Sequence, residues 1–432
     1  MLINRDFYLQ KLIDKKDNGR IKIITGIRRC GKSFILFKLY KDYLISCGVD
    51  ESQIISIALD DIDNIKYRNP FNLDKFIKDK TINKDKHFYV FIDEIQLSKS
   101  VGNPYIENDK ESISFVDVLL GLMKKENIDI YITGSNSKML SSDIMTQFRD
   151  RGDEIRINPL SFSEVYQLYK DKTVAFNHYA VYGGMPYVYS LKNDEEKSVY
   201  LKNLFSETYI KDILERNNIK NDAEILETLL DFISYSIGSL TNPNNLAKRF
   251  LSEKHINISS NTLSLYLGYF EEAFIFSHAK KYDVKGSKYF STPLKYYFSD
   301  LGLRNAILNF RQIEINHIME NILYNDLTRR GYNVDVGVVE HETNINGSRK
   351  KRQLEIDFVI NKAHQRYYIQ SALNVDSPEK QAQETASLTK INDSFKKIIV
   401  VKDNIIPYHD KNGILYIGIE EFLLNDSIIE SL

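Results

Sequence analysis

The stretch Gly26-Ile27-Arg28-Arg29-Cys30-Gly31-Lys32-Ser33 matches the phosphate-binding loop pattern G-x4-G-K-S. A short β-branched apolar run at 21–25 precedes the loop, and a helical run begins at Phe34 directly after it. The glycines let the backbone curl so that successive N–H groups point at phosphate oxygens, and the helix N-terminus adds partial positive charge. A chance Gly/Lys turn is the alternative, and the flanking strand and helix argue against it.

This loop predicts an ATP site in which Lys32 reaches the β- and γ-phosphates and Ser33 ligates Mg²⁺. The expected cofactors are therefore ATP and Mg²⁺. The loop residues expected to line the nucleotide are Gly26, Ile27, Arg28, Arg29, Cys30, Gly31, Lys32, Ser33 and Phe34.

A second apolar run, 88–92, ends in Asp93-Glu94. Its unbroken hydrophobicity is typical of a central parallel strand covered on both faces, and apolar residues followed by Asp-Glu form the Walker B pattern. We expect Asp93 to hold Mg²⁺ and Glu94 to polarise the attacking water. Acidic residues capping an ordinary strand are the alternative, which the upstream phosphate loop makes weaker.

A third run, 128–133, ends in Gly134-Ser135-Asn136. If this strand lies beside the Walker B strand, Ser135 or Asn136 is placed to sense the γ-phosphate. An ordinary N-cap for a helix starting near Lys138 is an equally good and compatible interpretation. The run at 54–59 predicts a further strand, and we expect the acidic residues Asp60 and Asp61 behind it to be solvated rather than catalytic.

Composition limits the remaining possibilities. A chain of 432 residues predicts two or three domains, and the 43% hydrophobic fraction indicates folded domains. The net charge of −1 excludes a global electrostatic attraction to nucleic acid, so such binding needs a local patch. Two cysteines, Cys30 and Cys47, predict a reducing, cytoplasmic location, and no apolar run is long enough to span a membrane or to form a signal peptide.

Further motifs carry a resemblance to a known family. Thr133-Gly134-Ser135 is followed by Arg151 and then by Pro159-Leu160-Ser161-Phe162-Ser163-Glu164. With these motifs the chain resembles the prokaryotic AAA-type ATPases whose core is followed by a winged-helix segment and a restriction-endonuclease-like domain of unknown function. Residue 150 is Asp where the family usually has Gly.

The resemblance implies two further nucleotide contacts. Arg151 becomes the candidate arginine finger, supplied to a neighbouring subunit's nucleotide, where it would stabilise charge on the transferring phosphoryl group. Pro186, in Gly183-Gly184-Met185-Pro186, becomes a contact near the adenine in a helical lid. The alternatives are a surface turn in which Arg151 pairs with neighbouring acids, and a helix C-cap and turn at the two glycines.

The middle of the chain predicts helices at 225–235, 246–252 and 262–274 and strands at 274–282 and 288–298. This helix, helix, helix, hairpin order is that of a winged-helix DNA reader. The candidate recognition helix, 260–272, has no Lys or Arg, whereas Lys280, Lys281, Lys285 and Lys288 lie on the wing. Phosphate contacts or minor-groove binding through the wing, and a spacer between domains, are equally compatible with this pattern.

The last third resembles the PD-(D/E)xK nuclease core, in which a helical Glu, a strand Asp and an E-x-K motif bind Mg²⁺ and activate water. Glu320 and Asp357 match the first two positions. Gln370 stands where the third acid belongs and Ala372 replaces the lysine, so we expect a nuclease-like fold with lost or badly impaired cleavage. The basic cluster at 348–352 suits either a phosphate contact or a solvated loop.

These patterns predict an α/β fold: a P-loop NTPase parallel-sheet core at 1–165, a helical lid at 166–222, a winged-helix-like domain at 223–310 and an inactive nuclease-like domain at 311–432. The predicted function is Mg²⁺-dependent ATP hydrolysis coupled to rearrangement of C-terminal domains that bind DNA or another partner. The alternative is a slowly hydrolysing protein-interaction switch that binds no nucleic acid, with a protein partner or self-association. An active ATP-dependent nuclease is disfavoured by Gln370 and Ala372.

Overall fold

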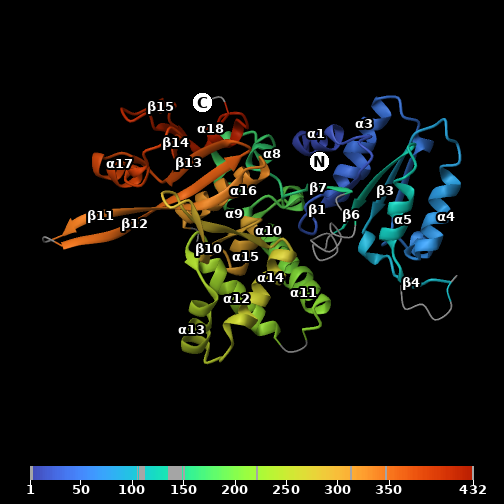
Figure 1. Ribbon diagram of the computed structural model, residues 1–432, viewed down its shortest axis with the longest axis horizontal. Helices are drawn as coiled ribbons and strands as arrows, with labels where there is room; N and C mark the ends of the chain where they lie inside the picture. The colour runs from blue at the N-terminus through green and yellow to red at the C-terminus, as the bar shows by residue number, and fades with distance from the viewer. Residues whose placement is uncertain are drawn as a thin grey trace. The chain divides into compact units, whose positions relative to one another are not determined.

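The computed structural model describes residues 3–104, 106, 112–134, 148, 151–219, 222–311, 314–345 and 348–430. The chain divides into two compact units, Met1–Pro159 with Glu272–Phe274, and Leu160–Glu271 with Ile275–Leu432 (Figure 1). Each unit has its own sheet.

The first unit is built on a five-stranded sheet in the order β2-β3-β6-β1-β7, with every neighbouring pair parallel. The strands are β1 (Ile21–Thr25), β2 (Ile54–Ala58), β3 (Phe88–Asp93), β6 (Ile128–Thr133) and β7 (Gly152–Arg156). All residues of β1, β3 and β6 are buried, because helices cover both faces of a parallel sheet. The strands predicted at 21–25, 54–59, 88–92 and 128–133 are therefore confirmed.

Helices of the first unit precede or connect these strands. They are α1 (Asp6–Asp14), α2 (Lys32–Phe34), α3 (Lys41–Ser46), α4 (Pro70–Lys80) and α5 (Phe115–Leu122). A π-helical segment, η1 (Ile35–Tyr40), joins α2 to α3, so the helix predicted after the phosphate loop is present with a wider turn in its middle. A short antiparallel pair, β4 (Val101–Gly102) and β5 (Ser112–Ile113), precedes α5.

The second unit begins with a helical region and ends in a sheet. Its helices are α8 (Phe162–Tyr166), α9 (Ala175–Tyr182), α10 (Asp194–Asn203), α11 (Lys211–Arg216), α12 (Ala223–Tyr235), α13 (Pro243–Lys254), α14 (Ser260–Glu272), α15 (Leu301–Ile307), α16 (Ile315–Arg329), α17 (Pro378–Thr385) and α18 (Ile419–Leu424). The predicted order of three helices and a hairpin is present as α12, α13, α14 and then β9 (Phe276–Asp283) with β10 (Lys288–Phe298). A short strand, β8 (Leu240–Thr241), pairs antiparallel with β10.

A nine-stranded sheet in the order β15-β16-β14-β13-β12-β11-β9-β10-β8 spans the second unit. Its remaining strands are β11 (Asn333–Ile345), β12 (Ser348–Lys362), β13 (Gln365–Ala372), β14 (Lys396–Val401), β15 (Tyr408–His409) and β16 (Leu415–Gly418). The long hairpin β11–β12 extends beyond the rest of this unit (Figure 1).

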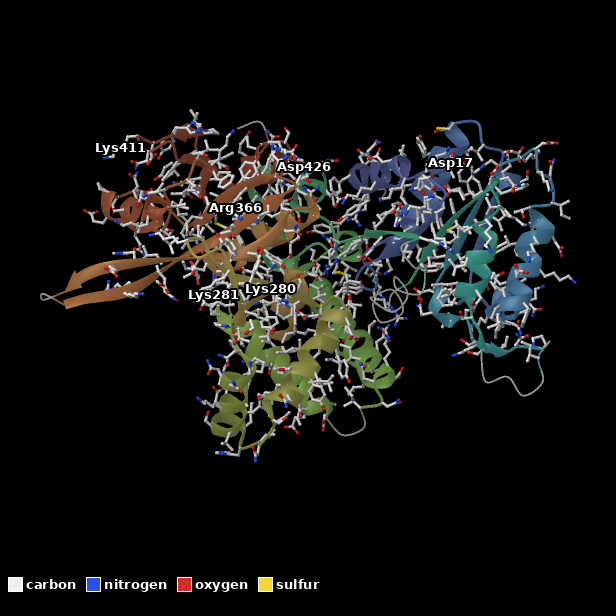
Figure 2. All side chains as sticks on the ribbon, in the orientation of Figure 1. Asp17, Lys280, Lys281, Arg366, Lys411 and Asp426 are labelled. Atoms are coloured by element: carbon white, nitrogen blue, oxygen red, sulfur yellow. The ribbon has the colours of Figure 1, made fainter. Side chains whose placement is uncertain are left out.

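The hairpin β9–β10 is part of this sheet rather than a free wing. Strand β9 pairs parallel with β11 through Lys281↔Val336 and Asp283↔Val338. Lys280, Lys281 and Arg366 therefore lie on the same sheet, whereas Lys411 lies near its other edge (Figure 2).

Gly183 and Gly184 form a tight junction inside the second unit. Gly183 ends α9 with φ 67°, and the Gly184 N–H donates to Asp300 Oδ2 at 2.6 Å. The Leu160 N–H donates to the Gly184 carbonyl at 2.7 Å, which brings the two backbones together. A Cβ on Gly184 would lie 2.1 Å from the Leu160 carbonyl oxygen, so this position has no room for a side chain.

We predict that Gly184→Ala lowers the melting temperature of the protein by several degrees, because backbone would have to move on both sides of the new methyl group. Gly268, inside α14, serves as the control, since a Cβ added there would meet no atom within 4 Å. Gly268→Ala should stabilise the protein by about 0.5–1 kcal/mol through lower backbone entropy. Equal melting temperatures for the two variants, measured by circular dichroism, would contradict this account of the junction.

Candidate functional site

The phosphate loop, the Walker B pair and Thr133 meet at one edge of the first sheet. The loop follows β1, Asp93 ends β3 and Thr133 ends β6, which lies between them. Because all three strands are parallel, their carboxyl ends lie at the same edge, where open α/β sheets bind ligands. The strand at 128–133 is thus confirmed as the neighbour of the Walker B strand.

The loop backbone needs its two glycines. Gly26 has φ 138°, and a Cβ there would lie 2.1 Å from the Ile157 carbonyl oxygen. Gly31 has φ 98° and precedes α2. Lys32 is buried, and its Nζ donates to the carbonyls of Gly26 at 3.0 Å and Ile27 at 3.1 Å. The ammonium is thereby held inside the curl of the loop.

The N-terminal helix braces this loop, which sequence reasoning missed. Arg5 is buried, and its guanidinium donates to the Cys30 carbonyl at 2.9 Å and the Asn158 carbonyl at 2.8 Å. Tyr8 stacks on Arg5 and accepts the Asn158 N–H at 3.1 Å. The carbonyl groups on one side of the phosphate loop are therefore tied to the segment after β7. The N–H groups of the loop stay available to bind a phosphate.

The Walker B acids are held differently from one another. Asp93 is buried, and its Oδ1 accepts hydrogen bonds from the Thr133 hydroxyl and from the Glu94 N–H at 3.2 Å. Glu94 has φ 52°, a left-handed conformation that is uncommon for residues other than glycine. Its half-buried carboxylate accepts from Gln96 Nε2. Thr133 and Gln96 are partners that the sequence patterns did not indicate.

A hydroxyl and a carboxylate are suitable ligands for Mg²⁺, which prefers oxygen donors and keeps several waters. Ser33 is exposed at the start of α2, and Asp93 keeps a second carboxylate oxygen beside the one bound by Thr133. The donor set therefore fits the expected ion.

The other predicted nucleotide contacts are placed as follows. Arg28, Arg29 and Phe34 are exposed, and Arg29 has a left-handed φ of 64°. Ser135 lies outside the described residues. Pro186 begins a 3₁₀ turn, η6 (Pro186–Ser190), in the second unit, directly after the Gly183-Gly184 junction.

Arg151 lies at the opposite edge of the first sheet from the phosphate loop. Its carbonyl accepts the N–H of Ile21, the first residue of β1, whereas the loop follows the last. Five residues of strand span about 16 Å, so Arg151 is remote from its own loop. Asp153 pairs instead with Arg20 at 3.0 Å and Lys15 at 3.6 Å. A role for Arg151 thus requires another subunit's nucleotide, and it stays a prediction.

The three nuclease-like positions lie close together in the second unit, but a lysine lies among them. Lys295, on β10, is buried, and its Nζ lies 2.9 Å from Glu320 Oε1 and 2.7 Å from Glu355 Oε1. Gln370 Oε1 accepts the Asp357 N–H at 3.3 Å, and Asp357 Oδ2 accepts the Ser371 N–H at 2.8 Å. Sequence reasoning missed Lys295 because it comes from the preceding hairpin.

Charge balance explains this cluster. Burial and the Glu320 carboxylate raise the pKa of the Asp357 carboxyl well above its usual range, and the Lys295 ammonium opposes that rise. The pKa of Lys295 is raised because Glu320, Asp357 and Glu355 together outweigh the effect of burial. Among the described residues there is no group of three or more His, Cys, Asp or Glu side chains arranged to hold a metal ion. The ammonium supplies the positive charge here.

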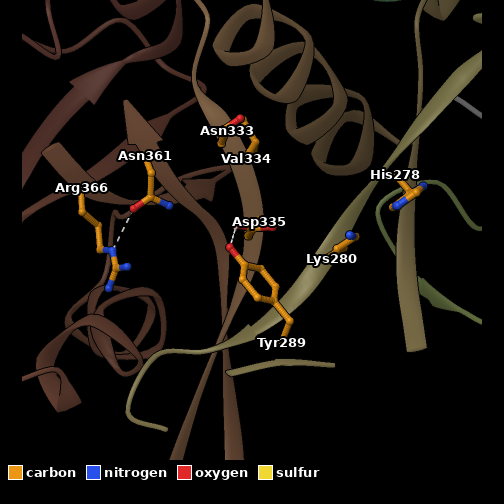
Figure 3. Close-up of a pocket in the computed structure, with 8 residues that line it drawn as sticks. All are labelled: His278, Lys280, Tyr289, Asn333, Val334, Asp335, Asn361 and Arg366. Atoms are coloured by element: carbon orange, nitrogen blue, oxygen red, sulfur yellow. Dashed lines mark hydrogen bonds between the residues drawn. The ribbon is translucent and has the colours of Figure 1, made fainter. Parts of the chain in front are cut away.

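A pocket of about 540 Å³, which we call the sheet pocket, opens on the second sheet where β9 and β10 meet the base of β11–β12 (Figure 3). Its lining is polar and mostly basic or amide in character. The lining residues are His278, Lys280, Tyr289, Asn333, Val334, Asp335, Asn361 and Arg366.

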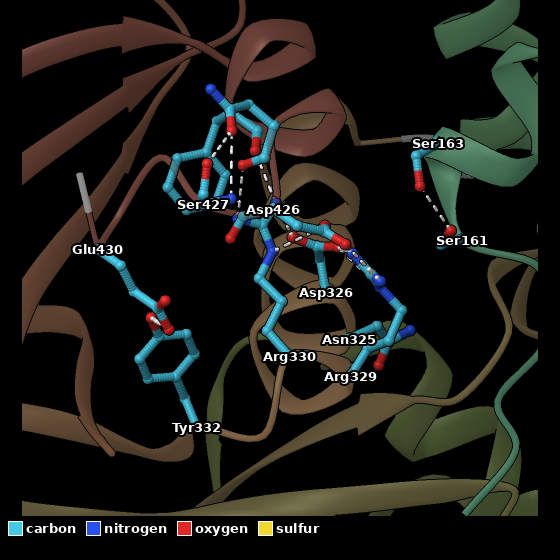
Figure 4. A network of polar contacts seen from close by, with 12 residues as sticks. Ser161, Ser163, Asn325, Asp326, Arg329, Arg330, Tyr332, Asp426, Ser427 and Glu430 are labelled. Atoms are coloured by element: carbon cyan, nitrogen blue, oxygen red, sulfur yellow. Dashed lines mark hydrogen bonds and ion pairs between the residues drawn. The ribbon is translucent and has the colours of Figure 1, made fainter. Parts of the chain in front are cut away.

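A second charged cluster has a structural role. Arg329 and Arg330, at the end of α16, pair with Asp326 and Asp426, and Arg330 also donates to the Phe422 carbonyl at 2.7 Å (Figure 4). These contacts fasten α18 and the residues after it to α16. Both arginines are buried, so their charges are used within the unit.

The sheet order and the phosphate loop define a P-loop ATPase fold, and comparison with known families agrees. Residues 18–166 match the family model of an AAA domain, and residues 173–314 match a domain of unknown function, DUF8612. The chain belongs to the family of AAA-type P-loop ATPases that includes an uncharacterized protein of Haemophilus influenzae. That relative is 32% identical over 405 residues, covering 92% of this chain and 93% of the relative.

Two further proteins are similar to much of the chain. The uncharacterized protein MJ1544 of Methanocaldococcus jannaschii is 28% identical over 98% of this chain and 88% of its own length. The Walker-type ATPase PABY2304 of Pyrococcus abyssi matches with a TM-score of 0.48 and 14% identity, over 71% of this chain and 96% of that one. No helix among the described residues is long and apolar enough to cross a membrane.

We predict that Lys295→Met destabilises the protein by about 3–5 kcal/mol at pH 8, because it leaves buried carboxylates without a counter-charge. Without the ammonium, the folded-state pKa of Asp357, already raised by burial and by the Glu320 carboxylate, rises further above its unfolded value. A carboxyl group whose pKa is raised by folding contributes to the free energy of unfolding at low pH. That contribution is lost as the pH rises through the folded-state pKa. The loss in melting temperature should therefore be smaller at pH 5 than at pH 8.

Two controls isolate this effect. Adding Glu320→Gln to Lys295→Met should restore part of the lost stability at pH 8. Lys362→Met removes an exposed pair with Glu430, 2.7 Å apart, and should cost less than about 1 kcal/mol. A pH-independent loss in Lys295→Met would show that lost packing, and not charge, explains the effect.

Proposed function

We propose that this protein is a Mg²⁺-dependent ATPase whose hydrolysis rearranges its C-terminal region. The observation that carries the proposal is the meeting of three parallel strand ends: the phosphate loop after β1, Asp93-Glu94 after β3 and Thr133 between them. Each part has one role in phosphoryl transfer, and together they account for binding, metal positioning and activation of water.

The roles follow from the geometry. The loop N–H groups and Lys32 would bind the β- and γ-phosphates, and Ser33 and Asp93 would hold Mg²⁺, which neutralises developing charge on the phosphates. Glu94 would orient and polarise the attacking water from its left-handed position at the strand end. Thr133 fixes Asp93, and Gln96 fixes Glu94, so both carboxylates are oriented before the nucleotide arrives.

The second unit is the proposed partner-binding part. The order α12, β8, α13, α14, β9, β10, with β8 paired to β10, supports a winged-helix-like domain at 223–310. The cluster of Glu320 on α16 with Asp357 on β12 and Gln370 on β13 supports a nuclease-like domain at 311–432 that has lost its chemistry. DNA is the leading partner, because both kinds of domain are nucleic-acid folds.

A nucleotide-gated protein-interaction switch is the second candidate. It is favoured by the pairing of β9 with β11, which builds the wing hairpin into the sheet, and by the absence of Lys and Arg from α14. ATP turnover measured with and without DNA separates the two candidates, since only the first predicts a response to DNA.

We expect Lys32→Ala and Glu94→Gln each to lower ATP turnover by about 100-fold or more, since each removes transition-state stabilisation in a preorganised site. Glu94→Gln should keep ATP affinity, whereas Lys32→Ala should weaken it. Asp60→Asn, a change at an exposed acid after β2, is the control and should leave turnover unchanged. Wild-type rates in both site variants would show that hydrolysis does not occur at this site.

We also predict that the protein does not cut plasmid DNA with Mg²⁺ or Mn²⁺ in the presence of ATP. The reason is that Lys295 neutralises the carboxylates that would bind a metal, and that Gln370 and Ala372 replace the third acid and the lysine. Metal-dependent cutting that disappears in Asp357→Ala would contradict the inactive assignment. Cutting that persists in that variant would indicate a contaminating nuclease.

A further inference from the structure

The sheet pocket displays an aromatic ring that folding does not bury. The Tyr289 side chain is 58% exposed. Its ring rests against Tyr282, with centroids 5.1 Å apart, and its hydroxyl donates to Asp335 Oδ2 at 2.9 Å. The ring is therefore held in one orientation while more than half of Tyr289 stays open to solvent. An exposed, preoriented ring of this kind is a platform on which a nucleic-acid base can stack.

Two cations flank this ring. Lys280 is exposed on β9, and Arg366 reaches the pocket from β13 (Figure 3). Arg366 Nε donates to Asn361 Oδ1 at 3.0 Å, and the guanidinium lies 5.2 Å from the Tyr282 ring and 5.5 Å from the Phe395 ring. These contacts fix the guanidinium before a ligand arrives. A planar, preorganised guanidinium is well suited to bind a phosphate.

The remaining polar groups suit base edges. Asn333 and Asn361 carry amides that can both donate and accept hydrogen bonds. Asp335 is the one acid among the described lining residues, and the Tyr289 hydroxyl already donates to it. Lys280 and Arg366 outnumber this single carboxylate. The pocket thus combines stacking, phosphate-binding and hydrogen-bonding groups within one surface.

The surrounding hairpin favours a single strand over a duplex. Helix α14, the candidate groove-reading helix, has no basic residue, whereas β9 and β10 place Lys280 and the Tyr289 ring on the same face of the hairpin. Base stacking on such a surface requires unpaired bases, which a duplex does not offer.

We propose that the sheet pocket binds single-stranded nucleic acid, with a base stacked on Tyr289 and backbone phosphates held by Lys280 and Arg366. The inference rests on the proposed nucleic-acid role of the second unit and adds the form of the ligand and its contacts. DNA and RNA share the required chemistry, so the experiment includes both.

The test is fluorescence anisotropy of labelled dT20, rU20 and a 20-base-pair DNA duplex with the full-length protein at 50 mM and 200 mM salt. We expect binding to dT20, to rU20 or to both, and tighter than to the duplex. Tyr289→Ala should weaken that binding about tenfold, the usual effect of removing one stacking ring. Tyr289→Phe keeps the ring and should bind nearly as the wild type does.

Lys280→Ala should weaken binding several-fold and make the salt dependence of log K shallower by about 0.7, as expected for one lost phosphate contact on a single strand. Matched controls lie near the other edge of the same sheet. Tyr408 is 43% exposed with its ring 4.9 Å from Tyr416, so Tyr408→Ala repeats the aromatic change. Lys411→Ala repeats the charge change, and both controls should bind as the wild type does.

Unchanged affinity in both Tyr289→Ala and Lys280→Ala would overturn the proposal, as would equal losses in the two controls. Binding to the duplex alone, or to none of the three probes at 50 mM salt, would also overturn it. ATP turnover measured on the same samples separates this failure from that of the proposed function. If ATP turnover is lost in Lys32→Ala while the wild-type protein binds none of the probes, the proposed ATPase function would be supported and the proposed nucleic-acid site would be wrong.

Discussion

The hydrogen bond from the Thr133 hydroxyl to the Asp93 carboxylate joins two central strands of the first sheet at the edge where the phosphate loop begins. Because β6 lies between β1 and β3, this contact sets the Walker B acid relative to the loop. The buried Arg5 fixes the other side of the loop through the Cys30 carbonyl. The site thus depends on strand order first, and on side-chain chemistry second.

In the second unit, buried carboxylates are neutralised by a lysine side chain. Where metal-dependent nucleases place a cation among carboxylates, this sheet places the ammonium of Lys295, which contacts Glu320 and Glu355 directly. An ammonium balances the carboxylates without supplying an open coordination position for water. Under the proposed assignment, the fold is kept while its cleavage chemistry is replaced, and the exposed face of the same sheet becomes available for binding.

Much of this arrangement could be predicted from sequence, because local patterns carry it. The strand before Gly26, the strand ending at Asp93 and the three-helix order before Phe276 were each indicated by periodicity and by turn residues. Contacts between distant segments could not be predicted in this way. Lys295 contacts Glu320, and Arg5 contacts Asn158, only in the folded protein. The sequence around Lys295 and around Arg5 has no local pattern that marks either residue. The pairing of β9 with β11 was likewise invisible, since parallel partners far apart in sequence leave no local signal.

The most direct test of the central claim is the rate of phosphate release from ATP by the purified wild-type protein, measured with Mg²⁺ and again with excess EDTA. A site assembled from Ser33, Asp93 and Glu94 predicts turnover with the metal and background release without it. Equal release under both conditions, or none with Mg²⁺ despite measurable ATP binding, would contradict the account of this strand edge as a Mg²⁺-dependent hydrolytic site.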